Sequence, residues 1–410
     1  MGVAVHPQPR VHIGEGALPP RLRPQASLGV LDITEWYGDT SGGIKTYLRE
    51  KAEYVASRPW LRHILVVPGD RDHIRDAGGG RTYRLHGPPI PRQRPYRFML
   101  ATRSVSRIVQ HERPDLIEIG SPFIVPWIVR HATRALDVPL VCFHHTNLPE
   151  QFAPRDAAAG VLHRVMHRAV WDYMRRLDRL FPLTIVASRA AARDLTAAGI
   201  DRIERVPLGV DLQRFTPAHR VHSALTRARH GLPDAPLAGY VGRFAREKEI
   251  DVVLDGWAGV ERATGARLVL IGAGPMERRL RAHRYGARVI FVPYQHDRDA
   301  LADLLAALDV YVAPGPIETF GLSALEALAS GVPVLSVNRG GVADLVTDSG
   351  AGRLFEWRTP ASVTAQAVAL LRDDLATLGQ RARAFAEAEH SWETVFDRLF
   401  AVYRRVLRRA

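Results

Sequence analysis

Short apolar runs alternate with longer amphipathic stretches along the first half of the chain. The runs cover residues 29–36, 63–69, 115–120, 140–145 and 183–188, and apolar residues at helical spacing follow each of them. Alternation of buried strands with amphipathic helices is typical of units whose strands pair in parallel. The pattern therefore predicts an α/β domain built on a parallel sheet.

The same alternation restarts after residue 202. Apolar runs at 237–244, 266–274, 288–294, 309–315 and 333–338 are separated by helical stretches. Strands that are apolar throughout are buried on both faces of a sheet, and ligands of such sheets bind at the carboxyl ends of the strands. We therefore expect a second doubly wound, Rossmann-like domain, with functional residues in the loops that follow the strands.

Proline and glycine residues mark the boundary between the two domains. A Pro-Leu-Gly turn lies within residues 205–217, and a second proline-rich segment covers 231–236. The last stretch begins with Ser391, a favourable N-cap, and keeps apolar residues at helical spacing. We predict an N-terminal domain at 1–204, a C-terminal domain at 205–390 facing it across a crevice, and a closing helix at 391–410.

Composition places the chain among ordinary globular proteins. It has 410 residues, 46% of them hydrophobic, and a single cysteine, Cys142. A disulfide needs two cysteines, so a reducing compartment is expected. No window of about 18 consecutive apolar residues occurs, and residues 1–30 lack a basic-then-apolar leader, so we expect neither a membrane-spanning helix nor a secretion signal. The expected location is cytoplasmic, soluble or peripheral at the inner face of the membrane.

Positive charge is concentrated in the first half of the chain. The chain carries 56 Lys and Arg against 43 Asp and Glu, and residues 1–200 hold 28 of the basic and 18 of the acidic ones, which is +10 of the net +13. Two segments are rich in arginine: 74–107, interleaved with Tyr83 and other aromatic residues, and 153–182. An anionic membrane surface is the partner that such segments suit. No nucleic-acid-binding motif accompanies them, so we expect no nucleic-acid partner.

Two glycine-containing segments have the form of anion sites. Gly42 and Gly43 precede a predicted helix, whose free backbone N–H groups and positive dipole end suit a phosphate. In the second domain Gly242 ends a predicted strand, and Arg243 and Lys248 follow before the next helix. A guanidinium beside an ammonium is able to clamp a diphosphate. The alternative for both segments is an ordinary helix cap with solvated surface charge.

Two carboxylates follow the predicted strand at 309–315. Glu318 lies in the loop after a Pro-Gly-Pro turn, and Glu326 lies eight positions later within an apolar run. Eight residues are about two helical turns, so both carboxylates are able to face one crevice. A sugar nucleotide there would place its hexose near Glu318, its ribose near Glu326 and its diphosphate over Gly321 and Leu322. An unpaired glutamate in an apolar run is costly, so we expect a polar partner for Glu326.

Together these segments resemble glycosyltransferase family 4, whose members have the two-domain GT-B fold. The resemblance rests on residues 318–334 (ETFGLSALEALASGVPV), 242–248 (GRFAREK), 270–275 (LIGAGP), 206–215 (VPLGVDLQRF) and 41–47 (SGGIKTY). Within that family, residues 313–331 and 41–48 look most like GDP-mannose-dependent α-mannosyltransferases, including the phosphatidylinositol mannosyltransferases.

This resemblance implies a retaining, metal-independent transfer of a hexose, in particular mannose from GDP-mannose, to a hydroxyl of a lipid or glycan acceptor. It assigns Arg243 and Lys248 to the donor diphosphate. It assigns Glu326 to the ribose and Glu318 to the hydroxyls of the donor sugar. The nucleotide sugar is then a substrate, and no cofactor is expected.

A histidine beside the donor sugar is also implied by the resemblance. We assign His145, at the end of the run 140–145, to this catalytic role, with its neighbour His144 as the alternative. The further donor-binding residues that the resemblance implies are Gly42, Gly43, Gly242, Gly272, Gly274, Tyr294, Phe320, Gly321 and Leu322.

Three other patterns could indicate a metal site or a reactive thiol, but each has a more common explanation. Asp-Arg-Asp strings begin at Asp70 and Asp297, but such strings arise readily in a chain with 24% charged residues and also cap helices. His163 and His167 have the spacing of a zinc helix without its intervening glutamate. Cys142 lies in an apolar strand, where an inert thiol is the commoner role. We therefore predict no metal site.

Several alternatives remain open from the residues alone. A UDP-sugar could replace GDP-mannose as donor, or the same fold could carry a sugar-nucleotide epimerase or hydrolase. A non-catalytic module that binds lipid through its arginines is the alternative from a different class. The acceptor, the linkage formed and the oligomeric state are not encoded in any motif found here.

Overall fold

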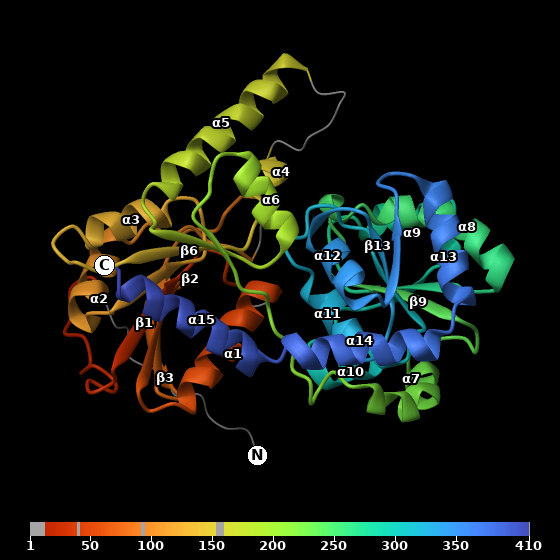
Figure 1. Ribbon diagram of the computed structural model, residues 1–410, viewed down its shortest axis with the longest axis horizontal. Coiled ribbons are helices and arrows are strands. Elements are labelled where there is room, and N and C mark those ends of the chain that lie inside the picture. Colours follow the sequence, from red (N-terminus) through yellow and green to blue (C-terminus); the bar gives the residue numbers. More distant parts are fainter. Residues whose placement is uncertain (1–12, 39–41, 92–94, 153–159, 410) are drawn as a thin grey trace.

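The computed structural model of the protein consists of two α/β lobes that lie side by side (Figure 1). The structure describes residues 13–38, 42–91, 95–152 and 160–409. The expectations for residues 92–94 and 153–159, which belong to the two arginine-rich segments, fall outside this range. Across the described ranges, no helix combines the length and the apolar character needed to cross a membrane.

The first lobe is built on an eight-stranded sheet with the order β3-β4-β2-β1-β5-β6-β7-β8. β3 runs antiparallel to β4, and the other neighbouring strands are parallel. Every residue of β1, β2 and β5 is buried, as expected for apolar strands covered on both faces. The strands are β1 (Leu28–Ile33), β2 (Leu61–Gly69), β3 (His73–Ala77), β4 (Gly80–His86), β5 (Leu116–Ile119), β6 (Leu140–His144), β7 (Leu183–Val186) and β8 (Ile203–Arg205).

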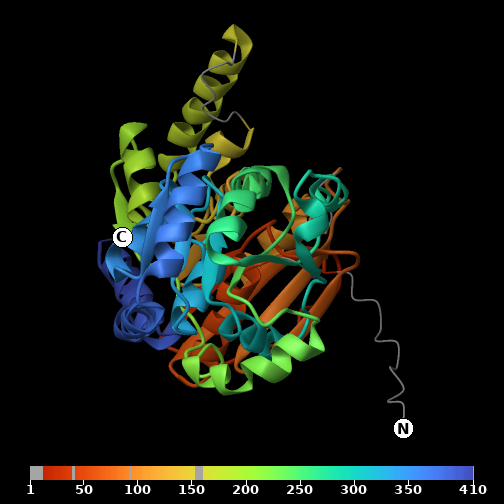
Figure 2. The ribbon, with the colours of Figure 1, turned by 90° about the vertical axis from the view of Figure 1, so that its right-hand side faces the viewer.

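Within the described residues of this lobe, six helices connect the strands. One of them, α5, extends well beyond the rest of the lobe, and both ribbon views show this (Figures 1 and 2). The helices are α1 (Gly43–Ala56), α2 (Thr102–Glu112), α3 (Val125–Ala132), α4 (Leu148–Phe152), α5 (Val161–Asp178) and α6 (Arg189–Ala197).

The second lobe holds a six-stranded parallel sheet with the order β11-β10-β9-β12-β13-β14. The chain adds strands on one side of β9 and then continues on the other side with β12, so β9 and β12 flank the switch point of the sheet. The strands are β9 (Leu237–Val241), β10 (Arg267–Ile271), β11 (Ile290–Val292), β12 (Val310–Ala313), β13 (Val334–Val337) and β14 (Gly352–Phe355).

Helices cover this second sheet and continue to the end of the chain. The α-helices are α7 (Ser223–Arg229), α8 (Ile250–Thr264), α9 (Glu277–Arg281), α10 (Arg298–Ala306), α11 (Leu322–Ala329), α12 (Gly340–Ser349), α13 (Pro360–Arg372), α14 (Leu375–Glu389) and α15 (Trp392–Leu407). Short 3₁₀ turns are η1 (Pro217–His222), η2 (Arg246–Lys248) and η3 (Gly286–Arg288). The two lobes resemble each other in their layered architecture, as the alternation of strands and helices predicts.

The chain crosses between the lobes at two adjacent places. The segment after β8 leads into the second lobe, and the junction of α14 and α15 leads back, so that α15 lies beside α1 of the first lobe (Figure 1). The two crossing segments are in contact, since the backbone N–H of Val210 donates to the carbonyl of His390 at 2.7 Å. A Cβ added at Gly209 would lie 2.7 Å from the Trp392 ring, so only glycine permits this contact.

Candidate active site

In each sheet, the point at which the strand order reverses faces the space between the lobes. β1 and β5 flank the switch point of the first sheet, and α1 begins shortly after β1, just as α11 begins after β12. A Cβ added at Gly43, the first residue of α1, would lie 3.9 Å from the Cβ of Leu322, the first residue of α11. Two helix N-termini therefore meet at the crevice, and their free N–H groups and dipoles favour an anion between them.

The loop that leads into α11 depends on glycine. Gly321, the N-cap of α11, has a φ of +98°, which L side chains rarely adopt. A Cβ there would also lie 2.2 Å from Cγ2 of Val342. Phe320 beside it is buried in the core of the lobe. This packing fixes where Glu318 and the N-terminus of α11 stand.

Lys248 and Glu318 form an ion pair in the crevice. Nζ of Lys248, at the end of η2 after β9, contacts Oε1 of Glu318, in the loop after β12. Both side chains remain partly exposed, and Gly315 leaves room beside them. The two residues that the sequence assigns to the diphosphate and to the donor sugar are therefore brought together, each at the carboxyl end of its strand.

Arg243 lies on the same side of the sheet but points toward solvent. Its guanidinium pairs with Glu247 at 2.5 Å, and about half of the side chain is exposed. Gly242 before it has a φ of +154°, and the loop after β10 packs directly on it, because a Cβ at Gly272 would lie 2.0 Å from the carbonyl oxygen of Gly242. A Cβ at Gly274 would similarly lie 2.4 Å from the carbonyl oxygen of Phe244. These glycines hold the two loops against each other.

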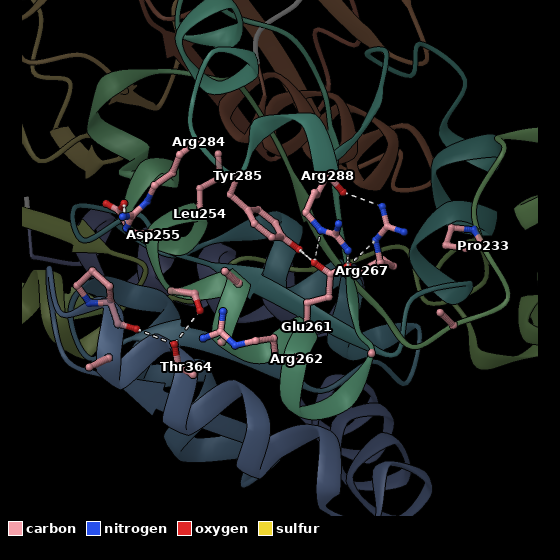
Figure 3. Close-up of a pocket in the computed structure, with 17 residues that line it drawn as sticks. Pro233, Leu254, Asp255, Glu261, Arg262, Arg267, Arg284, Tyr285, Arg288 and Thr364 are labelled. Atoms are coloured by element: carbon pink, nitrogen blue, oxygen red, sulfur yellow. Dashed lines mark hydrogen bonds and ion pairs between the residues drawn. The ribbon is translucent and has the colours of Figure 1, made fainter.

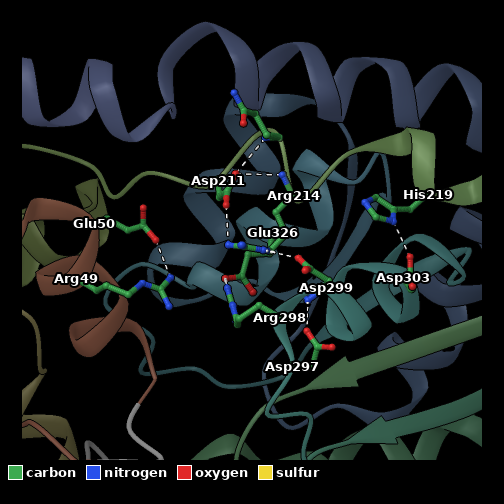
Figure 4. Close-up of polar contacts among 11 residues, drawn as sticks. Arg49, Glu50, Asp211, Arg214, His219, Asp297, Arg298, Asp299, Asp303 and Glu326 are labelled. Carbon is green, nitrogen blue, oxygen red and sulfur yellow. Dashed lines mark hydrogen bonds and ion pairs between the residues drawn. The ribbon is translucent and has the colours of Figure 1, made fainter. Parts of the chain in front are cut away.

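Glu326 lies in the middle of a charged cluster that draws on both lobes (Figure 4). Its side chain is buried, with 3% of the residue exposed, and Oε1 pairs with the Arg298 guanidinium at 2.5 Å. Burial raises the pKa of the Glu326 carboxyl, and Arg298 opposes that shift. The guanidinium of the same Arg298 lies over the ring of Phe215, 5.0 Å from its centroid. Sequence reasoning expected a polar partner for Glu326 but missed Arg298, although it stands between the two aspartates of a string already noted.

Further ion pairs surround Glu326 in this cluster. Arg49 of α1 pairs with Glu50 at 2.6 Å. Arg214, from the segment that crosses between the lobes, pairs with Asp211 and with Asp299, each at 2.7 Å. The cluster thus joins α1, the first crossing and the start of α10 around one carboxylate (Figure 4).

His145 reaches the crevice from the first lobe. Its ring stacks on Phe143 with the centroids 4.2 Å apart and lies 5.1 Å from the ring of Tyr47. Burial lowers the pKa of His145 to about 3, so the imidazole is neutral at physiological pH. Its backbone carbonyl accepts a hydrogen bond at 2.9 Å from Oγ1 of Thr319, the residue after Glu318. This bond connects the histidine loop directly to the carboxylate loop of the other lobe.

His144 faces a different part of the molecule. Its side chain lines a small cavity together with Met174 and Leu177 of α5. Burial lowers the pKa of His144 to about 4. Because consecutive strand residues point to opposite faces, the two histidines separate, and His145 is the one whose ring contacts Tyr47 of α1. Tyr294, in the loop after β11, is exposed and contacts His296 edge-on at 4.8 Å.

Residues of the Asp-Arg-Asp strings and Cys142, for which no metal or catalytic role was predicted, have structural roles. Asp297 caps α10 by accepting from the N–H of Asp299, and Asp72 accepts from the N–H groups of Ile13 and His86. In the ranges that the structure covers, no three His, Cys, Asp or Glu side chains gather as a ligand set. Burial raises the pKa of the Cys142 thiol to about 12, which keeps it protonated.

Part of the arginine-rich segment 74–107 lies inside the first lobe. Its aromatic residue Tyr83 is fully buried, and its hydroxyl donates to Glu112 at 2.6 Å. Arg81 beside it is also buried and pairs with Glu112 and Asp76. The reason is that both lie on β4, inside the sheet, where their polar ends have partners in the first lobe.

A cavity of about 1290 Å³ lies on the second lobe away from the crevice (Figure 3). Three of its arginines have carboxylate partners: Arg288 and Arg267 contact Glu261, and Arg284 contacts Asp255. Hydrogen bonds from Arg288 and Tyr285 lower the pKa of Glu261 to about 2. None of the residues assigned to the donor lines this cavity.

Comparisons with known proteins identify the family of the chain. Residues 41–214 match the family described as Glycosyltransferase Family 4, and residues 235–373 match Glycosyl transferases group 1. A GDP-mannose-dependent α-mannosyltransferase of Mycobacterium tuberculosis is 33% identical over 344 residues, covering 83% of this chain and 85% of that protein. A GDP-mannose-dependent α-(1-6)-phosphatidylinositol dimannoside mannosyltransferase of the same species is 34% identical over 78% of this chain and 83% of its own length.

The fold has known counterparts as well. A solved structure of sucrose-phosphate synthase from Thermosynechococcus elongatus superimposes with a TM-score of 0.76, at 23% sequence identity, over 93% of this chain and 100% of that one. Two parallel-sheet lobes with a site between them are the GT-B architecture that the sequence predicts. The chain belongs to glycosyltransferase family 4 and is a glycosyltransferase of the GT-B fold.

Proposed function

We propose that this enzyme transfers mannose from GDP-mannose to a hydroxyl of a lipid or glycan acceptor with retention of configuration. The observation that carries the proposal is the Lys248–Glu318 pair, set where the N-termini of α1 and α11 meet. The choice of GDP-mannose rests on relatives at 33% and 34% identity that bear this donor in their names. Residues 1–204 form the acceptor-side domain, residues 205–390 the donor-side domain, and the C-terminal helix closes the first domain.

The donor lies along the crevice in this proposal. Its diphosphate is held by Lys248, Arg243 and the amides at Gly43 and Leu322, because charge-assisted bonds and helix dipoles both stabilise phosphate. Glu318 accepts hydroxyl groups of the sugar. Glu326, pre-positioned by Arg298, accepts those of the ribose.

The reaction depends more on stabilising the negative charge of the leaving diphosphate than on acid catalysis. As the bond from the sugar to the β-phosphate breaks, the leaving diphosphate gains negative charge, which cations and N–H groups already in place stabilise. Such a leaving group needs no general acid. The imidazole of His145 is neutral, so it presents a hydrogen-bonding group to the sugar without adding a charge. A bound divalent ion has no part in the proposal.

Donor binding and turnover test this function. GDP-mannose, UDP-glucose, UDP-N-acetylglucosamine and UDP-galactose are titrated and assayed, each with EDTA and then with magnesium. We expect GDP-mannose to be preferred and EDTA to leave activity unchanged. Preference for a UDP-sugar would remove mannose from the proposal, and consumption of donor at the same rate without acceptor would identify a hydrolase. A requirement for magnesium would contradict the metal-independent mechanism.

We further propose that α5 docks the enzyme on an anionic membrane. Its first turns expose four apolar side chains at the spacing of one helix face: Val161, Leu162, Val165 and Met166. Leu162 is 76% exposed, and Arg164 and Arg168 are exposed on the same helix. Apolar residues flanked by arginine on a projecting helix suit the interface of a bilayer with anionic lipid. The acceptor would then be reached at the inner face of the membrane, in the cytoplasm.

Vesicle binding tests the docking helix. Wild type is sedimented with vesicles of phosphatidylcholine, with and without phosphatidylglycerol, beside Leu162→Glu/Val165→Glu. We expect binding only with phosphatidylglycerol, and its loss in the double variant. Val221→Glu/Leu225→Glu is the matched control, because those side chains are equally exposed but lie on the second lobe. Equal binding by both double variants would show that α5 is not the docking surface.

A further inference from the structure

Tyr47 of α1 stands between the C-terminal helix and the histidine of the crevice. Its side chain is completely buried. The centroid of its ring lies 5.7 Å from that of Phe396 in α15 and 5.1 Å from that of the His145 imidazole. The C-terminal helix, which the chain reaches only after it has crossed back from the second lobe, is therefore connected with His145 through the ring of Tyr47.

Three walls surround the imidazole of His145. The ring of Phe143 lies parallel to it, with an interplanar angle of 3° and 4.2 Å between the centroids. Gly120, directly after β5, closes a second side, because a Cβ built there would lie 3.5 Å from Cδ2 of His145. The Tyr47 ring forms the third wall, at an angle of 58° to the imidazole. Of these three walls, Tyr47 is the one that a helix supplies.

The hydroxyl group of Tyr47 fixes the orientation of its ring. This hydroxyl donates to Oε1 of Glu118 at 2.9 Å, and the Tyr403 hydroxyl of α15 donates to the other oxygen of the same carboxylate. The Lys51 ammonium, one turn further along α1, lies 3.4 Å from Glu118. A buried side chain whose ring is packed and whose polar end is hydrogen-bonded keeps one rotamer. The wall beside His145 is therefore rigid.

Helix α1 also connects Tyr47 with the proposed diphosphate site. Gly43, the first residue of α1, precedes Tyr47 by four residues, which is about one helical turn. Because the helix is continuous from one to the other, its geometry sets the distance between them. The same element therefore holds the amides proposed for the donor diphosphate and the wall of the imidazole proposed for the donor sugar.

These walls also keep the imidazole away from water. Burial lowers the pKa of His145 to about 3. The Asp32 carboxylate opposes this shift, whereas His144 and the Lys51 ammonium add to it. A smaller side chain in place of Tyr47 would admit water to the imidazole, so the pKa of His145 would rise toward its ordinary value of 6.5.

We propose that Tyr47 is a positioning residue for the glycosyl transfer and holds the His145 imidazole at a fixed distance from the N-terminus of α1. Tyr47 does not touch the donor and acts through His145. The inference rests on the proposed function, which places His145 beside the donor sugar. It adds Glu118 and Tyr403 to the residues on which the active site depends, because they fix Tyr47, and with Tyr403 it adds the C-terminal helix.

Turnover of two Tyr47 variants tests this role, with the donor that the enzyme prefers. Tyr47→Leu removes the ring, whereas Tyr47→Phe keeps the ring and loses only the bond to Glu118. We expect kcat to fall about tenfold or more in Tyr47→Leu and about two- to threefold in Tyr47→Phe, because small displacements of a reacting group are costly. The affinity for GDP should change by less than about twofold in both variants.

Tyr54→Leu is the matched control for a loss of packing. Tyr54 is also a buried tyrosine of α1, but its ring packs on Phe396 and Phe400 of α15 and not on His145. We expect Tyr54→Leu to lower the free energy of unfolding and to keep the kcat of wild type. An unchanged kcat in Tyr47→Leu, or an equal loss of kcat in Tyr54→Leu, would overturn the positioning role.

Nuclear magnetic resonance of labelled histidine separates positioning from folding. The His145 signal is identified by its absence in His145→Gln and followed from pH 5 to pH 8. We expect it to stay constant in wild type, Tyr47→Phe and Tyr54→Leu, and to titrate in Tyr47→Leu. The kcat of Tyr47→Leu should then fall further as the pH is lowered, because protonation removes the neutral imidazole.

The titration needs no substrate, so it distinguishes this inference from the proposed function. A His145 signal that does not titrate in Tyr47→Leu shows that the ring does not shield the imidazole, which counts against the inference alone. Full turnover of His145→Gln shows that the histidine has no part in the reaction, which counts against the proposed function.

Discussion

Lys51 of α1 donates a hydrogen bond at 2.7 Å to the hydroxyl of Tyr403 of α15, which is 352 residues later in the chain. The ammonium is completely buried and also pairs with Asp32 at 2.8 Å and with Glu118 at 3.4 Å. Tyr47 and Tyr403 both donate to Glu118. The C-terminal helix is thus attached to the first lobe through a buried polar network that lies behind the crevice.

Removing Lys51 should destabilise the protein strongly. Lys51→Met leaves Asp32 and Glu118 buried without their cation, for which we expect a loss of about 3–5 kcal/mol in the free energy of unfolding. Tyr403→Phe removes hydrogen bonds only and should cost about 1–3 kcal/mol. Urea unfolding followed by circular dichroism measures both. Lys45→Met, in the same helix, is the control, and a similar loss in that variant would argue against a special role of the network.

Glu35 should make stability depend on pH. Its carboxyl is buried, and burial raises its pKa to about 7, above the ordinary value of 4.5. The folded state therefore binds this proton more tightly than the unfolded state, so stability is highest below pH 4.5 and falls as pH rises toward 7. The contribution of this group is roughly 3 kcal/mol.

Glu35→Gln removes the ionisable group and should flatten that part of the profile. Unfolding free energies at pH 5, 6, 7 and 8 compare the variant with wild type, and the difference between them should grow with pH up to about 7. A constant difference across the series would mean that Glu35 is ionised in the folded protein at all four values.

The Lys248–Glu318 pair predicts opposite effects on donor binding. Glu318→Gln frees the Lys248 ammonium, so GDP should bind at least as tightly as in wild type while turnover falls by about 10²-fold or more. Lys248→Ala and Arg243→Ala should weaken GDP binding by roughly 1.5–3 kcal/mol. Calorimetry gives the affinities and product formation gives the rates. Full activity of Glu318→Gln would exclude that residue from the reaction.

Arg298 is expected to matter as much as Glu326. Arg298→Met leaves Glu326 buried and unpaired, which should cost about 3–5 kcal/mol of stability and weaken GDP binding. Arg298→Lys restores the charge and should recover part of both. Arg214→Met is the control from the same cluster, because its pairs are more exposed and should contribute less than about 1 kcal/mol. If Arg214→Met and Arg298→Met lose the same free energy of unfolding, burial does not determine how much each ion pair contributes to stability.

Much of the fold followed from local patterns. The apolar runs predicted five strands of each sheet, because a strand covered on two faces has to be apolar along its whole length, but they did not predict β3, β4, β8 or β14. Glu318 and Lys248 lie in contact because loops after parallel strands converge at one edge of a sheet. The hydrophobic periodicity and the parallel direction of the strands therefore predict the layered architecture and the location of the crevice.

Contacts between distant residues decided the rest. No pattern indicated that Tyr403 would meet Lys51, that Arg298 would pair with Glu326, or that Tyr83 would be buried. Alternation separated His144 from His145, but the packing of α1 determined which of them meets Tyr47. The charge on a side chain is written in the sequence, whereas its partner depends on where two distant segments pack against each other.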